Sequence, residues 1–477
     1  MLEPDLPVLS GCYPDPSLCR VGDDYYLVTS TFEYFPGIPV FHSTDLRTWT
    51  QLGHVIDRID QLDLTGVAGS RGLYAPTIRH YDGTFYLTCT LVDGTGPYEA
   101  GRSGNFVMTA LDAAGPWSDP HWLTDAAGFD PSLTFHDGTA WYVGSRPRPK
   151  PDWFDQAEVY LRELDLATMT LTGPEHVLWH GAVQGAVWAE GPHIFERNGY
   201  FYLNASEGGT EEHHAVSFAR SRTITGPYEG NRANPVFTHR TLGIDHPIVG
   251  VGHCDLVETP DGEWWAFLLG SRPRGGFHAN LGRETFAVAV DWEDDWPVFA
   301  RGVGQLAIVE GARRLGETQL TSGLDWNQVR TAASNFFEVV DDAITVRPTG
   351  AGLGDVATPA FVSVRQRHHA MSFSATLVDG DGGIAIRQSE ASWLSFGVAD
   401  GETVVLKNGE SLYRGPVGRR FELRADDQAY ELWLDGARVL EFDGRFLSAQ
   451  SVRGFLGVWV GVYTDSGGRF EAVAYTA

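Results

Sequence analysis

A short phrase that recurs five times restricts the fold of this chain more than any other feature. Each copy begins at a polar or small residue, usually beside a proline, and reaches a turn and an aromatic strand ten or eleven residues later. The copies lie about sixty residues apart, and a fixed spacing of this size indicates a repeated supersecondary unit. They begin at Asp15, Ala75, Asp130, Glu190 and His253.

Each unit has room for about four short strands, which is one blade of a β-propeller. Asp-Gly and Asn-Gly turns recur in the units, and these dipeptides tolerate the positive φ angles of hairpin turns. Trp, Tyr and Phe make up 12% of the chain, as suits a strand-rich protein. A β-sandwich whose hairpins resemble one another by chance is the alternative, and the constant offset disfavours it. We therefore predict an all-β fold with a five-bladed propeller.

The five starting positions are predicted to meet in one cavity. The first strand of each propeller blade lines the central channel, so equivalent positions of the five blades converge on the axis. Three acids and a histidine would then share a small space, where like charges raise one another's pKa and cost free energy. Four such residues at equivalent positions indicate a functional site.

The repeat ends near residue 297, and the composition changes there. We predict a propeller over residues 1–305, a connecting stretch over 306–323 and a β-sandwich over 324–477. The last part shows alternating strand patterns with turns at the spacing of a sandwich. This module could bind sugar, but a packing role for it is as good an interpretation.

Charge and cysteine content exclude several classes of partner and suggest a compartment. The net charge of −27 argues against nucleic acid and anionic membranes, and favours a neutral or cationic ligand. The N-terminal residues 1–7 lack the pattern of a signal peptide. The four cysteines show neither a disulfide framework nor zinc spacing, so we expect free thiols in the cytoplasm.

Three carboxylates in a narrow channel suit glycoside hydrolysis. That reaction needs one acid kept protonated for the leaving oxygen and one carboxylate kept ionised, as water-activating base or as nucleophile. A third acid nearby can raise the pKa of the proton donor. Motifs for zinc hydrolases, serine hydrolases, phosphate loops and dinucleotide binding are absent from the sequence. Residues 207–214 are rich in Glu and His, and we interpret them as a loop over the channel with Thr210 or Glu207 as a substrate contact.

Several motifs carry a resemblance to a known family. They include Tyr-Pro-Asp-Pro-Ser at residues 13–17, Phe-Glu-Tyr-Phe-Pro-Gly at 32–37, Phe-Asp-Pro-Ser at 129–132, Trp-Ala-Glu-Gly-Pro-His at 188–193 and Gly-Arg-Glu-Thr at 282–285. The chain resembles glycoside hydrolase family 43, in the branch of β-xylosidases and α-L-arabinofuranosidases with a C-terminal β-sandwich. The match is nearly continuous over the propeller and weaker over the last 150 or so residues.

The resemblance implies an exo-acting, inverting hydrolase that releases terminal β-D-xylose, α-L-arabinofuranose or both from short oligosaccharides. It implies Asp15 as general base, Glu190 as general acid and Asp130 as the residue that tunes and orients the acid. The positions that match contacts to the terminal sugar are Phe32, Tyr74, Ala75, Pro76, Thr210, His253 and Arg283. Tyr74 stands where many xylosidases have tryptophan, which leaves the choice between xylose and arabinose open.

The resemblance also implies features outside the acids. His253 matches an axial histidine that often lies beside a calcium ion or a water, so a calcium ion near the axis is expected, with His253 as its protein contact. An aromatic residue of the sandwich closes the pocket in relatives, and Phe455 is the candidate here. A homo-oligomer is compatible with the pattern. The competing interpretations are a sugar-binding propeller without catalysis and a retaining five-bladed glycosidase.

Overall fold

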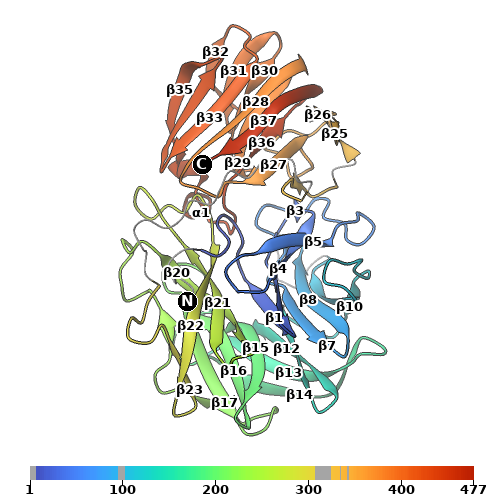
Figure 1. Ribbon diagram of the computed structural model, residues 1–477, viewed down its shortest axis with the longest axis vertical. Helices are drawn as coiled ribbons and strands as arrows, with labels where there is room; N and C mark the ends of the chain where they lie inside the picture. Colours follow the sequence, from blue (N-terminus) through green and yellow to red (C-terminus); the bar gives the residue numbers. More distant parts are fainter. Residues whose placement is uncertain (1–6, 95–101, 307–323, 333–334, 341–342) are drawn as a thin grey trace.

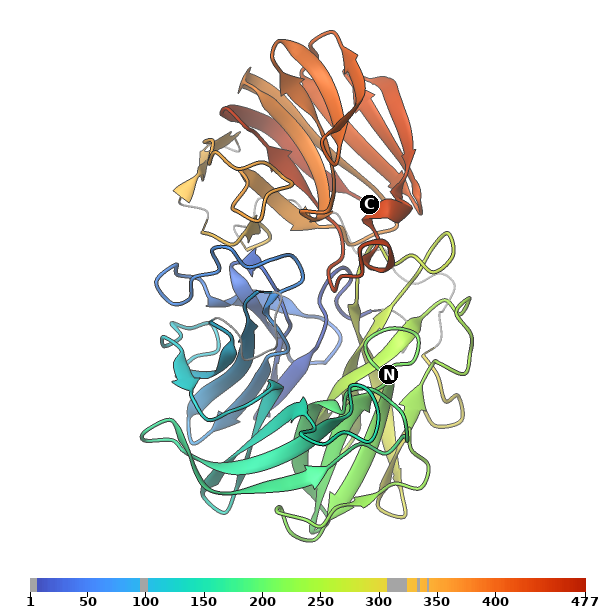
Figure 2. The same ribbon diagram turned by 180° about the vertical axis from the view of Figure 1, so that it is seen from behind.

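The computed structural model describes residues 7–94, 102–306, 324–332, 335–340 and 343–477, and Figures 1 and 2 show it from opposite sides. The regular secondary structure of the described residues is almost entirely β-strand. Five sheets of the N-terminal part surround a common axis, and two further sheets stack beside them as the C-terminal part. The predicted fold class, a five-bladed propeller followed by a β-sandwich, is confirmed.

Turn chemistry explains how blades two, three and four begin. In the hairpin of residues 136–139, Asp137 has φ +48° and Gly138 has φ +78°. Two successive positive φ angles define the type I′ turn, whose twist matches that of the paired strands. The same combination occurs at residues 82–83 and 198–199. The recurring dipeptides therefore fix the register of these first hairpins.

The propeller strands run in the order expected for blades. Blade one contains β1 (Ser17–Val21), β2 (Asp24–Val28), β4 (Gly37–Ser43) and β5 (Thr50–Ile56). Blade two contains β6 (Gly72–Leu73), β7 (Thr77–Tyr81), β8 (Thr84–Val92), β9 (Gly104–Ala110) and β10 (His121–Leu123). Blade three contains β11 (Phe129–His136), β12 (Thr139–Pro147), β13 (Ala157–Asp165) and β14 (Thr170–Trp179). Blade four contains β15 (Glu190–Arg197), β16 (Tyr200–Glu207), β17 (Ala215–Ser221), β18 (Glu229–Gly230) and β19 (Phe237–Thr238). Blade five contains β20 (Val249–Glu258), β21 (Trp264–Ser271), β22 (Glu284–Glu293) and β23 (Trp296–Phe299).

The ring closes through the N-terminal segment and through charges on the axis. The backbone N–H of Val8 donates to the carbonyl of Thr285 in blade five, at 2.7 Å. On the axis, Arg79 of blade two pairs with Asp255 of blade five at 2.7 Å. Asp255 also accepts from the hydroxyl of Ser17 in blade one, at 2.7 Å. These contacts join non-adjacent parts of the sequence and hold the channel at a fixed width.

The sandwich packs a seven-stranded sheet on a six-stranded one around a common apolar core. The first sheet has the order β25 (Phe337–Val340), β26 (Ala343–Val346), β37 (Gly468–Thr476), β28 (Ala370–Gly380), β33 (Arg420–Asp426), β34 (Ala429–Leu434) and β35 (Ala437–Asp443). The second has the order β27 (Phe361–Arg365), β36 (Trp459–Tyr463), β29 (Gly382–Ser389), β30 (Ser392–Ala399), β31 (Glu402–Lys407) and β32 (Glu410–Gly415). Two short helices, η2 (Gly444–Leu447) and α1 (Ala449–Val452), precede β36.

The sandwich docks on one side of the propeller. Strand β3 (Tyr34–Phe35) of the propeller pairs with β24 (Gln328–Val329) of the C-terminal part. Hydrogen bonds and ion pairs between the two parts use propeller residues 10–13, 33–35, 67–70 and 274–280. These segments belong to blades five, one and two. The sandwich therefore covers that side of the channel mouth.

Two predictions concern segments that the structure describes only at their edges. Apart from Leu306, the predicted connecting stretch lies outside the described residues, and so does the N-terminal segment up to residue 6.

Among the described helices, none has the length and apolar character needed to cross a bilayer.

Candidate active site

The predicted axial residues meet in one cavity of about 110 Å³. Its lining comes from all five blades and from the sandwich, and ten of the eleven predicted site residues contribute to it. The lining residues are Asp15, Phe32, Tyr74, Ala75, Phe129, Asp130, Trp188, Glu190, Gly209, Thr210, His253, Arg283 and Phe455. Pro76 is the exception. Pro76 is buried directly before β7 and does not line the cavity.

Backbone irregularities turn the acids onto the axis. Asp15 and Asp130 have φ +57° and +52°, in the left-handed region that non-glycine residues seldom adopt. Each precedes a proline, which has no N–H to donate to a neighbouring strand. In blade three the register shifts between Phe129 and Ser132, which is a β-bulge at Asp130. Bulges beside active sites re-aim side chains, and this one directs Asp130 inward.

In blade four a glycine allows the acid to point toward the axis. The register of β15 shifts between Glu190 and His193, and Gly191 between them has φ +56°. A Cβ atom at position 191 would lie 2.7 Å from Nε2 of His253. Only glycine therefore lets the acid strand of blade four approach the histidine of blade five. The Glu-Gly-Pro sequence places Glu190 beside the other axial groups for this reason.

Asp15 is the carboxyl group that the site keeps ionised. It accepts hydrogen bonds from the Ser30 hydroxyl at 2.6 Å and from Nη1 of Arg283 at 3.0 Å. Burial opposes its ionisation, but the Arg283 guanidinium and the Ser30 hydroxyl hold the pKa of Asp15 below its ordinary value. At neutral pH the Asp15 carboxylate and Arg283 thus form a buried ion pair.

Glu190 and Asp130 are shifted in the opposite direction. Burial, with the negative charge of Asp15 adding to it, raises the pKa of Glu190 to about 8. Burial and the proximity of Glu190 raise the pKa of Asp130 well above its ordinary value. The two carboxyl groups therefore titrate as a pair. The site combines one ionised carboxylate with a proton-bearing carboxyl pair, which is the division of roles that acid–base catalysis needs.

Arg283 joins the acids to the sugar-contact residues. Its Nη1 donates to Oγ1 of Thr210 at 3.0 Å as well as to Asp15. Its guanidinium lies 5.6 Å from the ring centre of Phe32 and 5.4 Å from that of Phe455. Arg283 therefore lines the cavity.

Three aromatic side chains form one wall of the cavity. The ring of Phe455 stacks on Phe32 at 6.0 Å and meets the edge of Tyr74 at 6.0 Å. Ser70 holds this wall together, because its hydroxyl accepts from the backbone N–H of Phe455 at 2.9 Å and its carbonyl accepts from the Tyr74 hydroxyl at 3.3 Å. The sandwich therefore supplies part of the cavity through Phe455.

The side chains do not build a calcium site. Calcium takes six to eight oxygen ligands in proteins. His253 lies with Nδ1 3.7 Å from Asp15, and burial lowers the pKa of this imidazole, so it is neutral. Over the part of the chain that the structure describes, no group of three or more His, Cys, Asp or Glu side chains is arranged to hold a metal ion. An ion at the axis would depend on water for nearly all of its ligands.

The loop after β16 contributes Thr210 and Gly209 to the cavity but not Glu207. The carboxylate of Glu207 accepts from the backbone N–H groups of Ala182 and Val183, at 2.8 and 2.9 Å. Glu207 is buried and serves to fasten the segment that precedes blade four. Of the two candidates for a substrate contact in this loop, Thr210 lines the cavity and Glu207 does not.

Phe129 and Trp188 line the cavity and were not predicted. Phe129 directly precedes the axial acid of blade three, as Tyr74 directly precedes Ala75 in blade two. The repeat therefore contained a signal for Phe129. Trp188 stands two residues before Glu190, at the start of the Trp-Ala-Glu-Gly-Pro-His motif, and has φ +48°, a conformation that the motif did not indicate.

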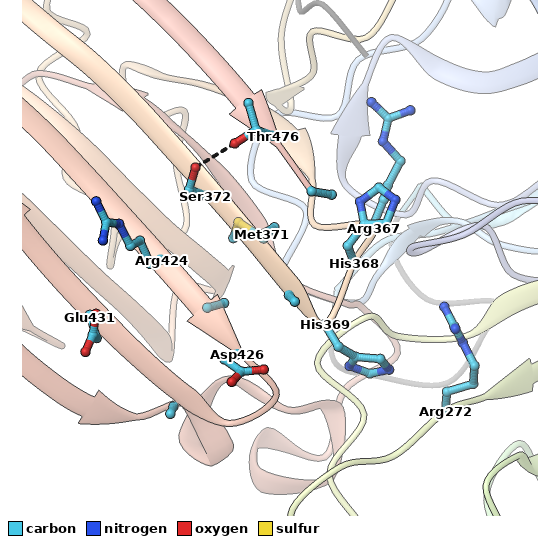
Figure 3. A pocket seen from close by; sticks show the side chains of 14 residues that line it. Arg272, Arg367, His368, His369, Met371, Ser372, Arg424, Asp426, Glu431 and Thr476 are labelled. Atoms are coloured by element: carbon cyan, nitrogen blue, oxygen red, sulfur yellow. Dashed lines mark hydrogen bonds between the residues drawn. The ribbon is translucent and has the colours of Figure 1, made fainter. Parts of the chain in front are cut away.

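A wider cavity of about 810 Å³ lies at the sandwich, near its contact with blade five (Figure 3). Its lining includes three arginines, but Arg272 pairs with the buried Glu284 and Arg424 pairs with Glu422, both at 2.7 Å. The hydroxyls of Ser372 and Thr476 bond each other at 2.7 Å. It contains none of the axial acids, so the candidate chemistry belongs to the smaller cavity.

Known proteins resemble this chain over most of its length. The model of a family described as glycosyl hydrolases family 43 matches residues 4–297. The chain is 36% identical to a xylosidase/arabinosidase of Butyrivibrio fibrisolvens, over 97% of this chain and 96% of that protein. It is 34% identical to a non-reducing end alpha-L-arabinofuranosidase, BoGH43B, of Bacteroides ovatus, over 97% of this chain and 91% of that protein.

Solved structures show the same architecture along the whole chain. A xylan beta-1,4-xylosidase from Bacillus halodurans superposes with a TM-score of 0.89 at 29% identity, and the match covers 100% of both chains. The agreement thus extends over the sandwich as well as the propeller.

Proposed function

Since this chain belongs to glycosyl hydrolase family 43, we propose that its axial cavity removes one terminal β-D-xylose, α-L-arabinofuranose or either sugar from a short oligosaccharide. The observation that carries the proposal is the pairing of an ionised Asp15 with a protonated Glu190 in one small cavity. A volume of about 110 Å³ suits a single sugar ring and excludes the middle of a polymer. The enzyme is therefore exo-acting.

The mechanism we propose inverts the anomeric carbon. Asp15 takes a proton from a water molecule as that water attacks the anomeric carbon from one face of the sugar. Glu190 gives its proton to the glycosidic oxygen on the other face, so the leaving sugar departs as an alcohol. Arg283 keeps Asp15 ionised before the attack. Asp130 shares the protonation equilibrium of Glu190 and orients it, which keeps the proton available at neutral pH.

The sugar-contact residues bind and orient the terminal sugar. Phe32, Tyr74 and Phe455 offer apolar faces to the sugar ring. Thr210 and Arg283 supply polar groups for its hydroxyls. β-D-Xylose and α-L-arabinofuranose present similar hydroxyl patterns, and nothing on this wall distinguishes them by charge. One cavity can therefore accept both.

Two measurements test the proposal. Nitrophenyl β-D-xyloside and nitrophenyl α-L-arabinofuranoside are assayed side by side, and at least one is expected to be cleaved. Proton NMR of the first product is expected to show the inverted anomer. A retained anomer would make Asp15 a nucleophile, and no cleavage of either glycoside would favour a sugar-binding propeller without catalysis.

The axial calcium stays a prediction, which the side chains alone do not favour. Treatment with a chelator followed by calcium addition tests it. Unchanged activity and unchanged melting temperature throughout would show that the enzyme works without the ion.

We also propose a cytoplasmic location. Support comes from the four cysteines, Cys12, Cys19, Cys89 and Cys254, which are buried and unpaired. Fractionation of the source cells checks the location. Light scattering of the purified protein determines whether it forms a homo-oligomer, which the sequence leaves open.

A further inference from the structure

The docking of the sandwich leaves one side of the cavity for the rest of the substrate. Its contacts fall on blades five, one and two, and Phe455 closes the cavity from that side. In a ring of five blades, the opposite rim belongs to blades three and four. The sugars beyond the scissile bond must leave the cavity across that rim.

The position of the proton donor places the leaving sugars on the same side of the cavity. Glu190 begins the first strand of blade four and gives its proton to the leaving oxygen in the proposed mechanism. The first leaving sugar therefore lies beside Glu190. Trp188, two residues earlier, lines the cavity there and is half-buried.

A loop that carries two aromatic residues, Trp153 and Phe154, is hydrogen-bonded to Trp188. Residues 148–156 connect β12 to β13, and they follow the part of β12 that pairs with the start of β11, so they lie at the cavity end of blade three. The carbonyl of Asp155 accepts from the backbone N–H of Trp188 at 2.9 Å. Nε1 of Trp153 donates to the carbonyl of Ala186 at 2.7 Å.

The loop is also held from within. The side chain of the buried Gln156 accepts from the backbone N–H of Asp152 at 2.7 Å, and its carbonyl accepts from that of Arg148 at 2.9 Å. The backbone around Phe154 is therefore fixed in place, yet the Phe154 side chain is 81% exposed. A group of exposed and partly exposed apolar side chains beside a cavity indicates a binding surface, and Phe154 forms such a group with the partly exposed Trp153 and Trp188.

We propose that Trp153, Phe154 and Trp188 form an aromatic platform that binds the leaving part of the oligosaccharide. In this arrangement Trp188 borders the first leaving sugar and Phe154 contacts the second. The inference rests on the proposed function and extends it to substrates of three or more sugars. The C–H faces of neutral sugar rings suit aromatic side chains, which combine a broad apolar face with polar edges. A net charge of −27 agrees with a neutral chain rather than an acidic one.

The test compares Phe154→Ala with a matched control. Leu111 is 83% exposed and follows β9 at the end of blade two away from the cavity, so Leu111→Ala removes an equally exposed apolar side chain elsewhere. Each protein is assayed on the nitrophenyl glycoside, the disaccharide and the trisaccharide. Xylobiose and xylotriose are used, or arabinobiose and arabinotriose where arabinofuranose is the preferred terminal sugar.

Phe154→Ala is expected to lower kcat/KM for the trisaccharide about three- to tenfold, mainly through KM. The reason is that the bound trisaccharide would lose one apolar contact that is partly buried in the complex. The disaccharide and the nitrophenyl glycoside should change less than about twofold, because neither reaches the second leaving position. Phe154→Tyr should restore the trisaccharide rate, and Leu111→Ala should change none of the three.

Two results would overturn the platform while leaving the proposed function intact. One is an unchanged trisaccharide rate in Phe154→Ala. The other is an equal loss on all three substrates, which indicates a disturbed loop rather than a lost contact. Absence of wild-type activity on every glycoside would instead overturn the proposed function, and the platform with it.

Discussion

Glu190 and Asp15 can be separated by the leaving group, because a good leaving group departs without a proton. Glu190→Ala is expected to lower cleavage of xylobiose by about 10²–10⁴-fold and to affect a dinitrophenyl glycoside much less. Asp15→Ala removes the base that activates water, so both substrates should lose activity together. Steady-state kinetics of the two folded variants on both substrates provide the measurement. An equal loss on both substrates in Glu190→Ala would show that Glu190 is not the proton donor.

The raised pKa of Glu190 also predicts a pH-dependent cost in stability. The pKa is about 8 in the folded protein and near 4.5 in an unfolded chain. Between these values the folded state holds a proton that the unfolded state has lost, so this group lowers the free energy of unfolding as pH rises, by at most about 1.4 kcal/mol per pH unit. Glu190→Gln cannot ionise. Its melting temperature relative to the wild type should therefore increase from pH 5 to pH 8, and a constant difference would contradict the raised pKa.

The loop that carries Ser70 connects Tyr74 of the propeller with Phe455 of the sandwich, which belong to the same aromatic wall of the cavity. Ser70→Ala removes the acceptor for the Phe455 N–H, at a cost of about 1 kcal/mol for one hydrogen bond. We expect KM to rise about fivefold with kcat nearly unchanged. Gly454→Ala should act in the same direction, because its Cβ would lie 2.7 Å from the Ser70 hydroxyl.

Ser392→Ala is the control for this element. Ser392 is buried, like Ser70, and its hydroxyl donates to the carbonyl of Phe446 within the sandwich, at 2.7 Å. Its loss should lower the melting temperature and leave KM unchanged. If Ser392→Ala raised KM to the same extent, the effect of Ser70 would be one of general stability.

For the whole molecule, buried charge between the domains predicts a single unfolding transition. Arg387 is fully buried, lies 3.2 Å from Glu390 and 3.9 Å from Glu33, and donates to the Tyr34 hydroxyl at 3.4 Å. Burial raises the pKa of Glu33 to about 7, although Arg387 opposes the shift. Arg387→Met removes one cationic partner of the buried Glu33 and of Glu390, which still pairs with Arg330 at 3.5 Å, so unfolding should become easier by at most about 3–5 kcal/mol.

Calorimetry of Arg387→Met should show one transition shifted as a unit, since both domains depend on this contact. Arg424→Met is the matched control, because Arg424 is exposed and pairs with Glu422 on the surface of the sandwich. Its effect should stay below about 1 kcal/mol. Two separate transitions in the wild type would contradict the prediction.

The sequence allowed the axial site to be predicted because it lies on the repeat. The constant offset placed Asp15, Asp130 and Glu190 at equivalent positions without any knowledge of distance. Phe455 required the resemblance to a family, since its partner Ser70 is 385 residues away and no local pattern relates them. The loop with Phe154 could not be predicted, because exposed loop residues follow neither the strand period nor the repeat.

The contacts between the propeller and the sandwich also limit how this chain could exchange domains with its relatives. A module attached by a flexible linker can be transplanted between proteins without changing the host. Here the sandwich brings Phe455 to the sugar and anchors it on Ser70, while Arg387 meets Glu33 across the boundary. A chimera that exchanged sandwiches would therefore inherit the substrate preference of both parents. Recombination within this lineage should conserve the two domains as one inherited unit.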